Sequence, residues 1–321
     1  MELSLIPTNA ASAATALVTG GAGFIGSHVV EALVAEGHRV RVLDDLSSGS
    51  ARNLEACSAH CELIVGDIRD RDLVRSACSG VDAVFHLAAF ISVPGSVDDP
   101  RTADEVNIGG TLNVLLGARD SGVRRVVFSS SAAVYGEPAH VPTAESEMPQ
   151  PQSPYGVEKL YGEHMARVCT AQYGLETVCL RYFNVYGPRQ NPDSEYAAVI
   201  PKFAQALIQG QPPTIFGDGS QTRDFLYAGD VARANLLAAR SSSAVGRVIN
   251  VASGQSVSIA HLFEVMCAAC GSPIQPRFGP PRRGDVHRSE ADVTLARDVL
   301  GVEAAMPLEE GLRRTIEAMR S

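Results

Sequence analysis

The stretch TGGAGFIG, residues 19–26, decides how the first part of this chain folds. It follows the apolar run TALVT at 15–19 and opens FIGSHVVEALVAEG at 24–37, a helix pattern closed by glycine. Glycines at such a junction permit a tight turn, close approach of a pyrophosphate to the backbone, and close packing of the helix on the sheet. The first N–H groups of the helix would face the phosphates. We therefore predict a dinucleotide-binding loop with contacts from Gly20, Gly23, Phe24, Ile25 and Gly26.

Later strand ends supply the other expected contacts to the cofactor. Asp44, in the run VLDD, lies 24 residues after Gly20, where a carboxylate hydrogen-bonds the adenosine ribose. Because this carboxylate would repel a 2′-phosphate, NAD is favoured over NADP; a solvated acid at a strand end is the alternative. Asp67 and Ile68 follow another strand and are expected at the adenine, with a helix cap as the alternative for Asp67. We also expect Ala88, in the run AVFHLAA, at the cofactor site.

The first half of the chain alternates strand and helix patterns. Strand-like runs lie at 15–20, 38–45, 61–67, 83–89 and 124–131, and helical patterns lie at 24–37, about 69–79, about 101–120 and about 154–173. Such alternation is typical of α/β proteins with a parallel sheet covered on both faces. We predict a Rossmann-type, doubly wound parallel sheet.

The second half has a different texture. After the strand-like run at 176–187, loops rich in Pro and Gly separate helical patterns at about 196–209, 229–240, 258–270 and 291–299. This predicts a smaller α/β substrate-binding domain that closes over the carboxyl ends of the sheet. We expect a flexible leader at 1–14, an NAD-binding domain at 15–181 and a substrate-binding domain at 182–321, with the segment 228–251 returning to the first domain.

Composition excludes several classes of protein. The chain has 321 residues and a formal net charge of −9 without a basic run, so we expect no nucleic-acid partner. No apolar run is long enough to span a membrane, and the N-terminal segment does not have the pattern of a secretory signal. Seven scattered cysteines do not form a disulfide framework, which indicates a reducing, cytoplasmic location. The lone pair Cys267 and Cys270 has no second cysteine pair or nearby histidine, so we expect no metal.

The stretch SPYGVEK, residues 153–159, carries a candidate acid/base. Ser153 and Pro154 are typical of a helix start, and Tyr155 and Lys159, four residues apart, then share one helix face. A free tyrosine has a pKa of about 10, but a neighbouring ammonium and a positively charged nicotinamide both favour the phenolate. We predict that Tyr155 is the general acid/base and that Lys159 also binds the nicotinamide ribose. A surface Tyr–Lys pair is the alternative.

A run of hydroxyls ends another predicted strand. In VVFSSSAAVYG, residues 126–136, Ser129, Ser130 and Ser131 stand at the carboxyl end of a central strand, where ligands bind in open α/β sheets. One of these hydroxyls can hydrogen-bond the reacting hydroxyl and relay its proton. We choose Ser131; a serine that simply ends the strand is the alternative.

Six motifs together resemble the extended short-chain dehydrogenase/reductase superfamily: TGGAGFIG, SSSAAVYG, YGVEK, RYFNVYGPRQNP, GDGSQTRDFLY and RRGDVHRSEAD. Within it, the chain is similar over about residues 15–315 to the UDP-sugar 4-epimerases, the UDP-glucose and UDP-N-acetylglucosamine 4-epimerase group. The resemblance implies that Tyr155 takes the proton from the sugar O4 while hydride passes from C4 to NAD. It also implies that the 4-keto sugar turns over, that hydride returns to its other face, and that NAD stays bound throughout.

The resemblance also implies a nucleotide-sugar site. Asn184 matches a residue that touches the diphosphate, and Arg223 and Arg282 match arginines that grip it. Phe216 would lie against uracil, Asp285 would meet the uridine ribose, and Asn107 matches an asparagine near the nicotinamide. The alternatives are a core position for Phe216, a surface pair of Arg223 with Asp224, and helix packing for Asn107.

Departures from family patterns narrow the reaction. Sugar 4,6-dehydratases carry an Asp–Glu pair where this chain has Ala132 and Ala133, so dehydration is disfavoured. UDP-glucuronate 4-epimerases tend to show Thr and a second Arg in place of Asn184 and Asn191. Ser289 replaces a bulky aromatic of strict UDP-galactose epimerases, which should leave room for a 2-acetamido group.

The predicted function is NAD-dependent inversion at C4 of a UDP-linked hexose or N-acetylhexosamine. The alternatives are a UDP-glucuronate 4-epimerase, another NAD-dependent nucleotide-sugar oxidoreductase, and a non-catalytic NAD-binding sensor. The patterns at about 101–120 and 154–173 resemble helices that pair two subunits as a four-helix bundle. We therefore expect a homodimer with Met165 and Val168 near its seam.

Overall fold

The computed structural model describes residues 14–192, 198–281 and 286–320. Its largest element is a seven-stranded sheet with the order β10-β6-β5-β4-β1-β2-β3, in which every neighbouring pair is parallel. The strands are β1 (Thr15–Thr19), β2 (Arg39–Asp44), β3 (Cys61–Val65), β4 (Ala83–His86), β5 (Arg125–Ser131), β6 (Glu176–Tyr182) and β10 (Val248–Val251). Strand order reverses beside β1, so the predicted doubly wound parallel sheet is confirmed.

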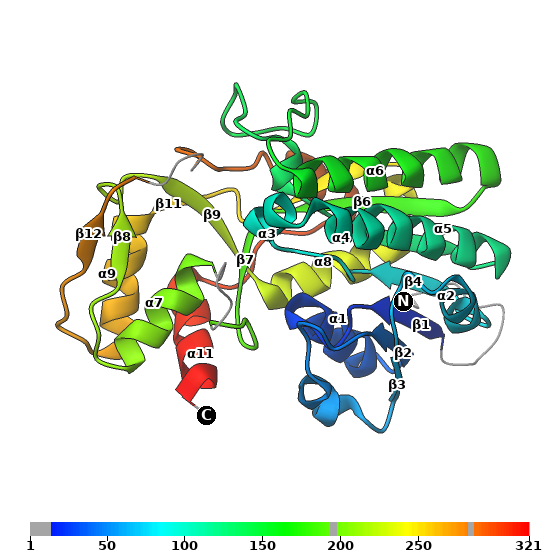
Figure 1. Ribbon diagram of the computed structural model, residues 1–321, viewed down its shortest axis with the longest axis horizontal. Helices are drawn as coiled ribbons and strands as arrows, with labels where there is room; N and C mark the ends of the chain where they lie inside the picture. Colours follow the sequence, from blue (N-terminus) through cyan, green and yellow to red (C-terminus); the bar gives the residue numbers. More distant parts are fainter. Residues whose placement is uncertain (1–13, 193–197, 282–285, 321) are drawn as a thin grey trace.

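Helices cover both faces of this sheet (Figure 1). One apolar layer joins the sheet to α1 (Phe24–Ala35), α8 (Ala228–Arg240) and α10 (Thr294–Leu300). The other joins it to α2 (Arg71–Cys78), α5 (Thr111–Asp120) and α6 (Pro154–Tyr173). Because both faces are covered, the central strands β5 and β6 are buried along nearly their whole length and carry apolar residues at their centres.

Of the two helices predicted at about 101–120 and about 154–173, only the second is one continuous α-helix. The helix predicted at 154–173 is α6 itself: the Ser153 side chain accepts from the Gly156 N–H, Pro154 opens the helix, and Gly174 ends it at φ 71°. The pattern at 101–120 is instead three pieces, α4 (Pro100–Asp104), a π-helical turn at Glu105–Gly110 and α5. A short helix, α3 (Val93–Asp98), precedes them and was not predicted.

A smaller set of elements forms a second apolar core. This set of elements contains two small sheets. One consists of β7 (Asn184–Tyr186), β9 (Thr222–Tyr227) and β11 (Ser256–Ser258), and the other of β8 (Thr214–Phe216) and β12 (Arg277–Gly279). The helices α7 (Val199–Ile208), α9 (Ile259–Cys270) and α11 (Leu308–Arg320) pack with them. Figure 1 shows these helices gathered on one side of the molecule, away from α5 and α6. Helix α11 was not predicted.

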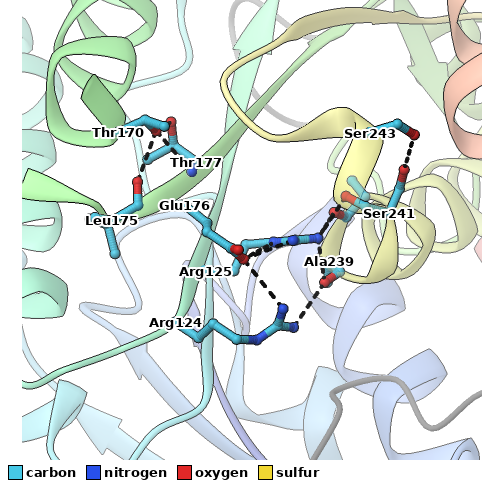
Figure 2. Close-up of polar contacts among 10 residues, drawn as sticks. Arg124, Arg125, Thr170, Leu175, Glu176, Thr177, Ala239, Ser241 and Ser243 are labelled. Atoms are coloured by element: carbon cyan, nitrogen blue, oxygen red, sulfur yellow. Dashed lines mark hydrogen bonds and ion pairs between the residues drawn. The ribbon is translucent and has the colours of Figure 1, made fainter.

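A buried arginine ties α8 to the large sheet (Figure 2). The side chain of Arg125, at the start of β5, is only 1% exposed. Its Nη1 donates to the carbonyl oxygens of Ala238, Ala239 and Ser241 at distances of 3.1, 2.8 and 2.8 Å. Its Nε and Nη2 donate to the Glu176 carboxylate at the start of β6. A cation therefore donates to the carbonyl oxygens that have no partner within the helix at the carboxyl end of α8, where the helix dipole is negative.

Candidate functional site

The glycine loop has a shape that only glycines permit at two positions. Gly20 has φ +69°, and a Cβ there would lie 2.6 Å from the Ala88 backbone nitrogen. A Cβ at Gly26 would lie 2.0 Å from the Gly20 carbonyl oxygen. Gly23 is the N-cap of α1, and no side chain caps the first N–H groups of that helix. The loop therefore leaves the start of α1 open toward a cavity, as a bound pyrophosphate requires.

Asp44 lies at the edge of this cavity and also supports the loop. One carboxylate oxygen accepts from the Ala22 N–H at 2.9 Å, and the other accepts from the Leu46 N–H at 2.8 Å. Burial raises the pKa of Asp44, while these two backbone donors act in the opposite direction. The acid predicted at the ribose is therefore fixed in place and is not a freely solvated side chain.

The predicted adenine contacts line the same cavity. Asp67, Ile68 and Ala88 are among its lining residues. Asp67 pairs with Arg69 at 2.6 Å, and this hydrogen bond holds the pKa of the Asp67 carboxyl below its usual range. The helix-cap alternative for Asp67 is wrong, because Asp70 caps α2 by accepting from the N–H groups of residues 72 and 73.

The three predicted catalytic residues meet at the other end of this cavity. Ser131, Tyr155 and Lys159 all line it, and the Ser131 hydroxyl is close enough to the Tyr155 phenol to lower its pKa. The Ser131 oxygen also accepts from the Ala133 N–H at 3.1 Å. The Lys159 ammonium donates to the Ser129 carbonyl oxygen at 2.8 Å and lies 5.7 Å from the centre of the Tyr155 ring. The arrangement suits proton transfer to or from a ligand hydroxyl beside the phenol.

Burial dominates the protonation of this pair. Loss of water raises the pKa of Tyr155 to about 12, with the Ser131 hydrogen bond acting against it and the Glu158 charge adding to it. Burial likewise lowers the pKa of Lys159 to about 8, and Glu158 opposes that change. Lys159 therefore does not bring the phenol toward neutral pH by itself. Of the two cations that were predicted to lower the pKa of Tyr155, the positively charged nicotinamide is therefore the one on which that prediction depends.

Asn107 lies behind the cavity wall rather than in it. Its side chain donates to the Phe90 carbonyl oxygen at 3.0 Å and accepts from the Phe90 N–H at 2.8 Å. It also donates to the buried Glu158 carboxylate at 2.6 Å. Phe90 lines the cofactor cavity and Asn107 does not. The asparagine expected near the nicotinamide therefore holds the loop after β4, which is close to the packing alternative.

A second cavity contains three of the predicted nucleotide-sugar residues. Asn184, Phe216 and Arg223 line it, and Phe216 is half-buried at its surface rather than in the core. The Arg223 Nη1 donates to the Thr222 carbonyl oxygen at 2.7 Å, and the Asn184 amide donates to the Asp224 carbonyl oxygen at 3.2 Å.

The structure decides one alternative for this cavity and places another of its predicted residues outside the cavity lining. The Asp224 carboxylate is buried and accepts from the backbone N–H groups of Ser253, Gly254 and Ala291, so the proposed surface pair with Arg223 is wrong. Ser289 lies beside β9, with its N–H donating to the Thr222 carbonyl oxygen, and it does not line the cavity. Arg282 and Asp285 lie outside the described residues.

The two cavities adjoin through one short segment. Val185 and Gln190 line both of them. Gln190 belongs to the motif RYFNVYGPRQNP, but no feature of that motif alone shows that its side chain reaches both cavities. The cavity lined by Arg223 therefore adjoins the cavity lined by Tyr155.

The described part of the chain shows neither a metal site nor a membrane-spanning helix. It contains no group of three or more His, Cys, Asp or Glu side chains placed to hold a metal, and all seven cysteines are free thiols. Across 14–192, 198–281 and 286–320, no helix has both the length and the apolar character that crossing a membrane demands.

Comparison with known proteins agrees with this geometry. A UDP-glucose 4-epimerase of Mycolicibacterium smegmatis is 43% identical over 309 residues, which cover 95% of this chain and 98% of that protein. A solved UDP-N-acetylglucosamine 4-epimerase from Methanobrevibacter ruminantium, in complex with UDP-N-acetylmuramic acid, is 41% identical with a TM-score of 0.92 and covers 96% and 99% of the two chains. A Thermotoga maritima UDP-glucose 4-epimerase with UDP-glucose is 41% identical with a TM-score of 0.90, covering 95% and 98%.

The family assignment covers most of the chain. Residues 16–252 match the NAD dependent epimerase/dehydratase family. This range contains the glycine loop, Asp44 and the group of Ser131, Tyr155 and Lys159. The chain belongs to this family, and its cofactor is NAD.

Proposed function

We propose that this protein inverts C4 of a UDP-linked hexose or N-acetylhexosamine. One observation carries the proposal: the Ser131–Tyr155 hydroxyl pair, beside Lys159, faces a cofactor cavity that continues past Gln190 into a cavity lined by Arg223 and Phe216. A nucleotide sugar anchored at the second cavity would present its sugar ring to the phenol. The names of the compared proteins, UDP-glucose and UDP-N-acetylglucosamine 4-epimerases, support this substrate class.

The side chains have distinct tasks in this proposal. The Tyr155 phenolate removes the proton from the sugar O4 and returns it after the ring has turned over. The Ser131 hydroxyl, which lines the same cavity as the phenol, shares the O4 hydrogen bond. Lys159 holds a positive charge beside the phenol and the nicotinamide ribose. NAD, when bound, accepts the C4 hydride and gives it back.

The second cavity supplies affinity and selectivity. Arg223 offers a guanidinium to the diphosphate, Asn184 an amide, and Phe216 a ring face for uracil. Ala132 and Ala133, in the turn after β5, provide no acid or base for eliminating water, so the 4-keto sugar is kept for reduction. The comparison with a UDP-N-acetylglucosamine 4-epimerase supports the inference that 2-acetamido sugars are accepted alongside plain hexoses.

We further propose a homodimer that works in the cytosol. Val157, Val168 and Tyr173 on α6 are 51%, 42% and 50% exposed, which is unusual for large apolar side chains and suits a helix-to-helix seam. Met165 packs partly into the adjacent core instead. Light scattering at micromolar concentration tests the dimer: a monomer would refute it. The free thiols of all seven cysteines support a reducing compartment.

Turnover followed by NMR on a panel of UDP-sugars tests the activity. Incubation with UDP-glucose and with UDP-N-acetylglucosamine should each give the C4 epimer, with no net consumption of added NAD. Steady consumption of NAD would indicate a net oxidoreductase instead. Binding of NAD without conversion of any UDP-sugar, including UDP-glucuronate, would favour the sensor alternative.

A further inference from the structure

We propose that Arg189 is a positioning residue that fixes the loop shared by the two cavities by clamping it to the cofactor helix α1. This inference rests on the proposed function, because it concerns how the sugar nucleotide is held. Residues 187–191 follow β7, and Gln190 within them lines both the cofactor cavity and the neighbouring one. Arg189 itself lines neither cavity, so it acts through its neighbour.

The clamp consists of three side chains. The Arg189 guanidinium donates to both oxygens of Glu31, from Nη1 at 2.5 Å and from Nη2 at 2.7 Å. Its Nη2 also donates to His28 Nδ1 at 2.9 Å, while His28 Nε2 donates to the Pro188 carbonyl oxygen at 3.1 Å. This pattern requires a neutral imidazole with its proton on Nε2, and burial lowers the pKa of His28 to about 4. Two residues of α1 thus hold two consecutive residues of the loop.

The clamp also connects to the glycine loop. Arg189 Nη1 lies 3.5 Å from the Asn53 carbonyl oxygen, and the Asn53 side-chain amide donates to the Ala22 carbonyl oxygen at 2.8 Å. Helix α1 itself begins at Phe24, directly after the glycines. The loop beside the substrate cavity is therefore anchored to the same elements that receive the cofactor pyrophosphate.

The backbone of Arg189 shows that the loop needs such an anchor. Arg189 has φ +70°, a left-handed conformation that side-chain-bearing residues rarely adopt. Such a conformation persists where surrounding contacts impose it, and it tends to occur at functional sites. Without the fork of hydrogen bonds to Glu31, the loop is free to relax, and Gln190 would leave its place between the cavities.

The test uses two ion pairs of α1 that match in exposure. Arg189 and Glu31 are 20% and 39% exposed, and Arg240 and Glu36 are 27% and 38% exposed. Arg240 joins the end of α1 to α8 and lines neither cavity. Arg189→Lys and Arg240→Lys each remove a guanidinium fork and keep the positive charge. A general effect of weakening an ion pair on α1 would therefore appear in both variants.

The measurement is titration calorimetry of UDP-glucose into NAD-loaded wild-type and variant protein. If relaxation leaves about a tenth of the molecules with the loop in place, Arg189→Lys should bind UDP-glucose about tenfold more weakly. Arg240→Lys should bind within twofold of wild type. Glu31→Gln, which removes the partner charge from the other side, should weaken binding in the same direction as Arg189→Lys.

Unchanged affinity of Arg189→Lys, or an equal loss in Arg240→Lys, would overturn the positioning role and leave the proposed function intact. A wild-type protein that binds no UDP-sugar would overturn both together.

Discussion

Replacing Arg125 by methionine should cost far more stability than replacing its neighbour Arg124 in the same way. Both guanidiniums reach Glu176 and the end of α8 (Figure 2). Arg125 is 1% exposed and holds three carbonyl oxygens, whereas Arg124 is 32% exposed with single bonds of 3.3 and 3.4 Å. Removing one partner of a buried ion pair costs about 3–5 kcal/mol, and an exposed pair contributes about 0–1 kcal/mol.

The lower end of that range applies to Arg125→Met. Glu176 is 36% exposed and keeps Arg124, so water and the second guanidinium compensate part of its loss. The carbonyl oxygens at the end of α8 are more enclosed and would lose their charged donor. We expect the free energy of unfolding to fall by about 3 kcal/mol for Arg125→Met and by under about 1 kcal/mol for Arg124→Met.

Urea unfolding followed by far-UV circular dichroism measures this difference, since the chain has no tryptophan. With a slope of about 3 kcal/mol/M for a chain of this size, the midpoint of Arg125→Met should fall by about 1 M. Equal midpoints for the two variants would refute the reasoning that burial decides the cost.

Three further predictions concern the site. Tyr155→Phe should lower kcat by about 10²–10⁴-fold while UDP affinity in calorimetry stays unchanged, because only the acid/base is removed; a loss under tenfold would argue against that role. Gly26→Ala should lose bound NAD, measured by absorbance after denaturation, because its Cβ would lie 2.0 Å from the Gly20 oxygen, whereas Gly109→Ala, with open space around it, should keep NAD. The free energy of unfolding should fall as pH drops from about 6.5 to about 4. Over this range His28 binds a proton in the unfolded state but stays neutral in the folded state, where its pKa is about 4. His28→Gln should flatten this part of the urea-midpoint profile, and parallel profiles would contradict the assignment.

The elements that sequence predicts well are those specified by neighbours along the chain. The glycine loop, the buried strands and α6 with its Ser153 cap and Gly174 end all carry local signals. Helix α11 also had such a signal, since Leu312, Thr315 and Ile316 form one buried stripe, but its many charges obscured it. The contacts of Asn107 in the π-helical turn could not be predicted, because Phe90 and Glu158 come from distant parts of the chain.

The same distinction holds for the site. The grouping of Ser131, Tyr155 and Lys159 follows from strand ends and helix spacing, so pattern and topology together suffice to predict it. The pKa of Tyr155 could not be predicted, because burial by the whole fold outweighs the neighbouring ammonium. Gln190 and the left-handed Arg189 were missed for a related reason: their importance arises only where two cavities and helix α1 converge.

The most direct test of the central claim follows a deuterium label at C4 of the sugar. In the proposed reaction, hydride leaves C4 beside the Tyr155 phenol, stays within the site, and returns to the opposite face of the same carbon. With UDP-[4-²H]glucose, NMR should therefore show the C4 epimer with deuterium still at C4 and no net change in NAD. Appearance of protium at C4 of the product, or no epimer from any UDP-sugar offered, would contradict the account.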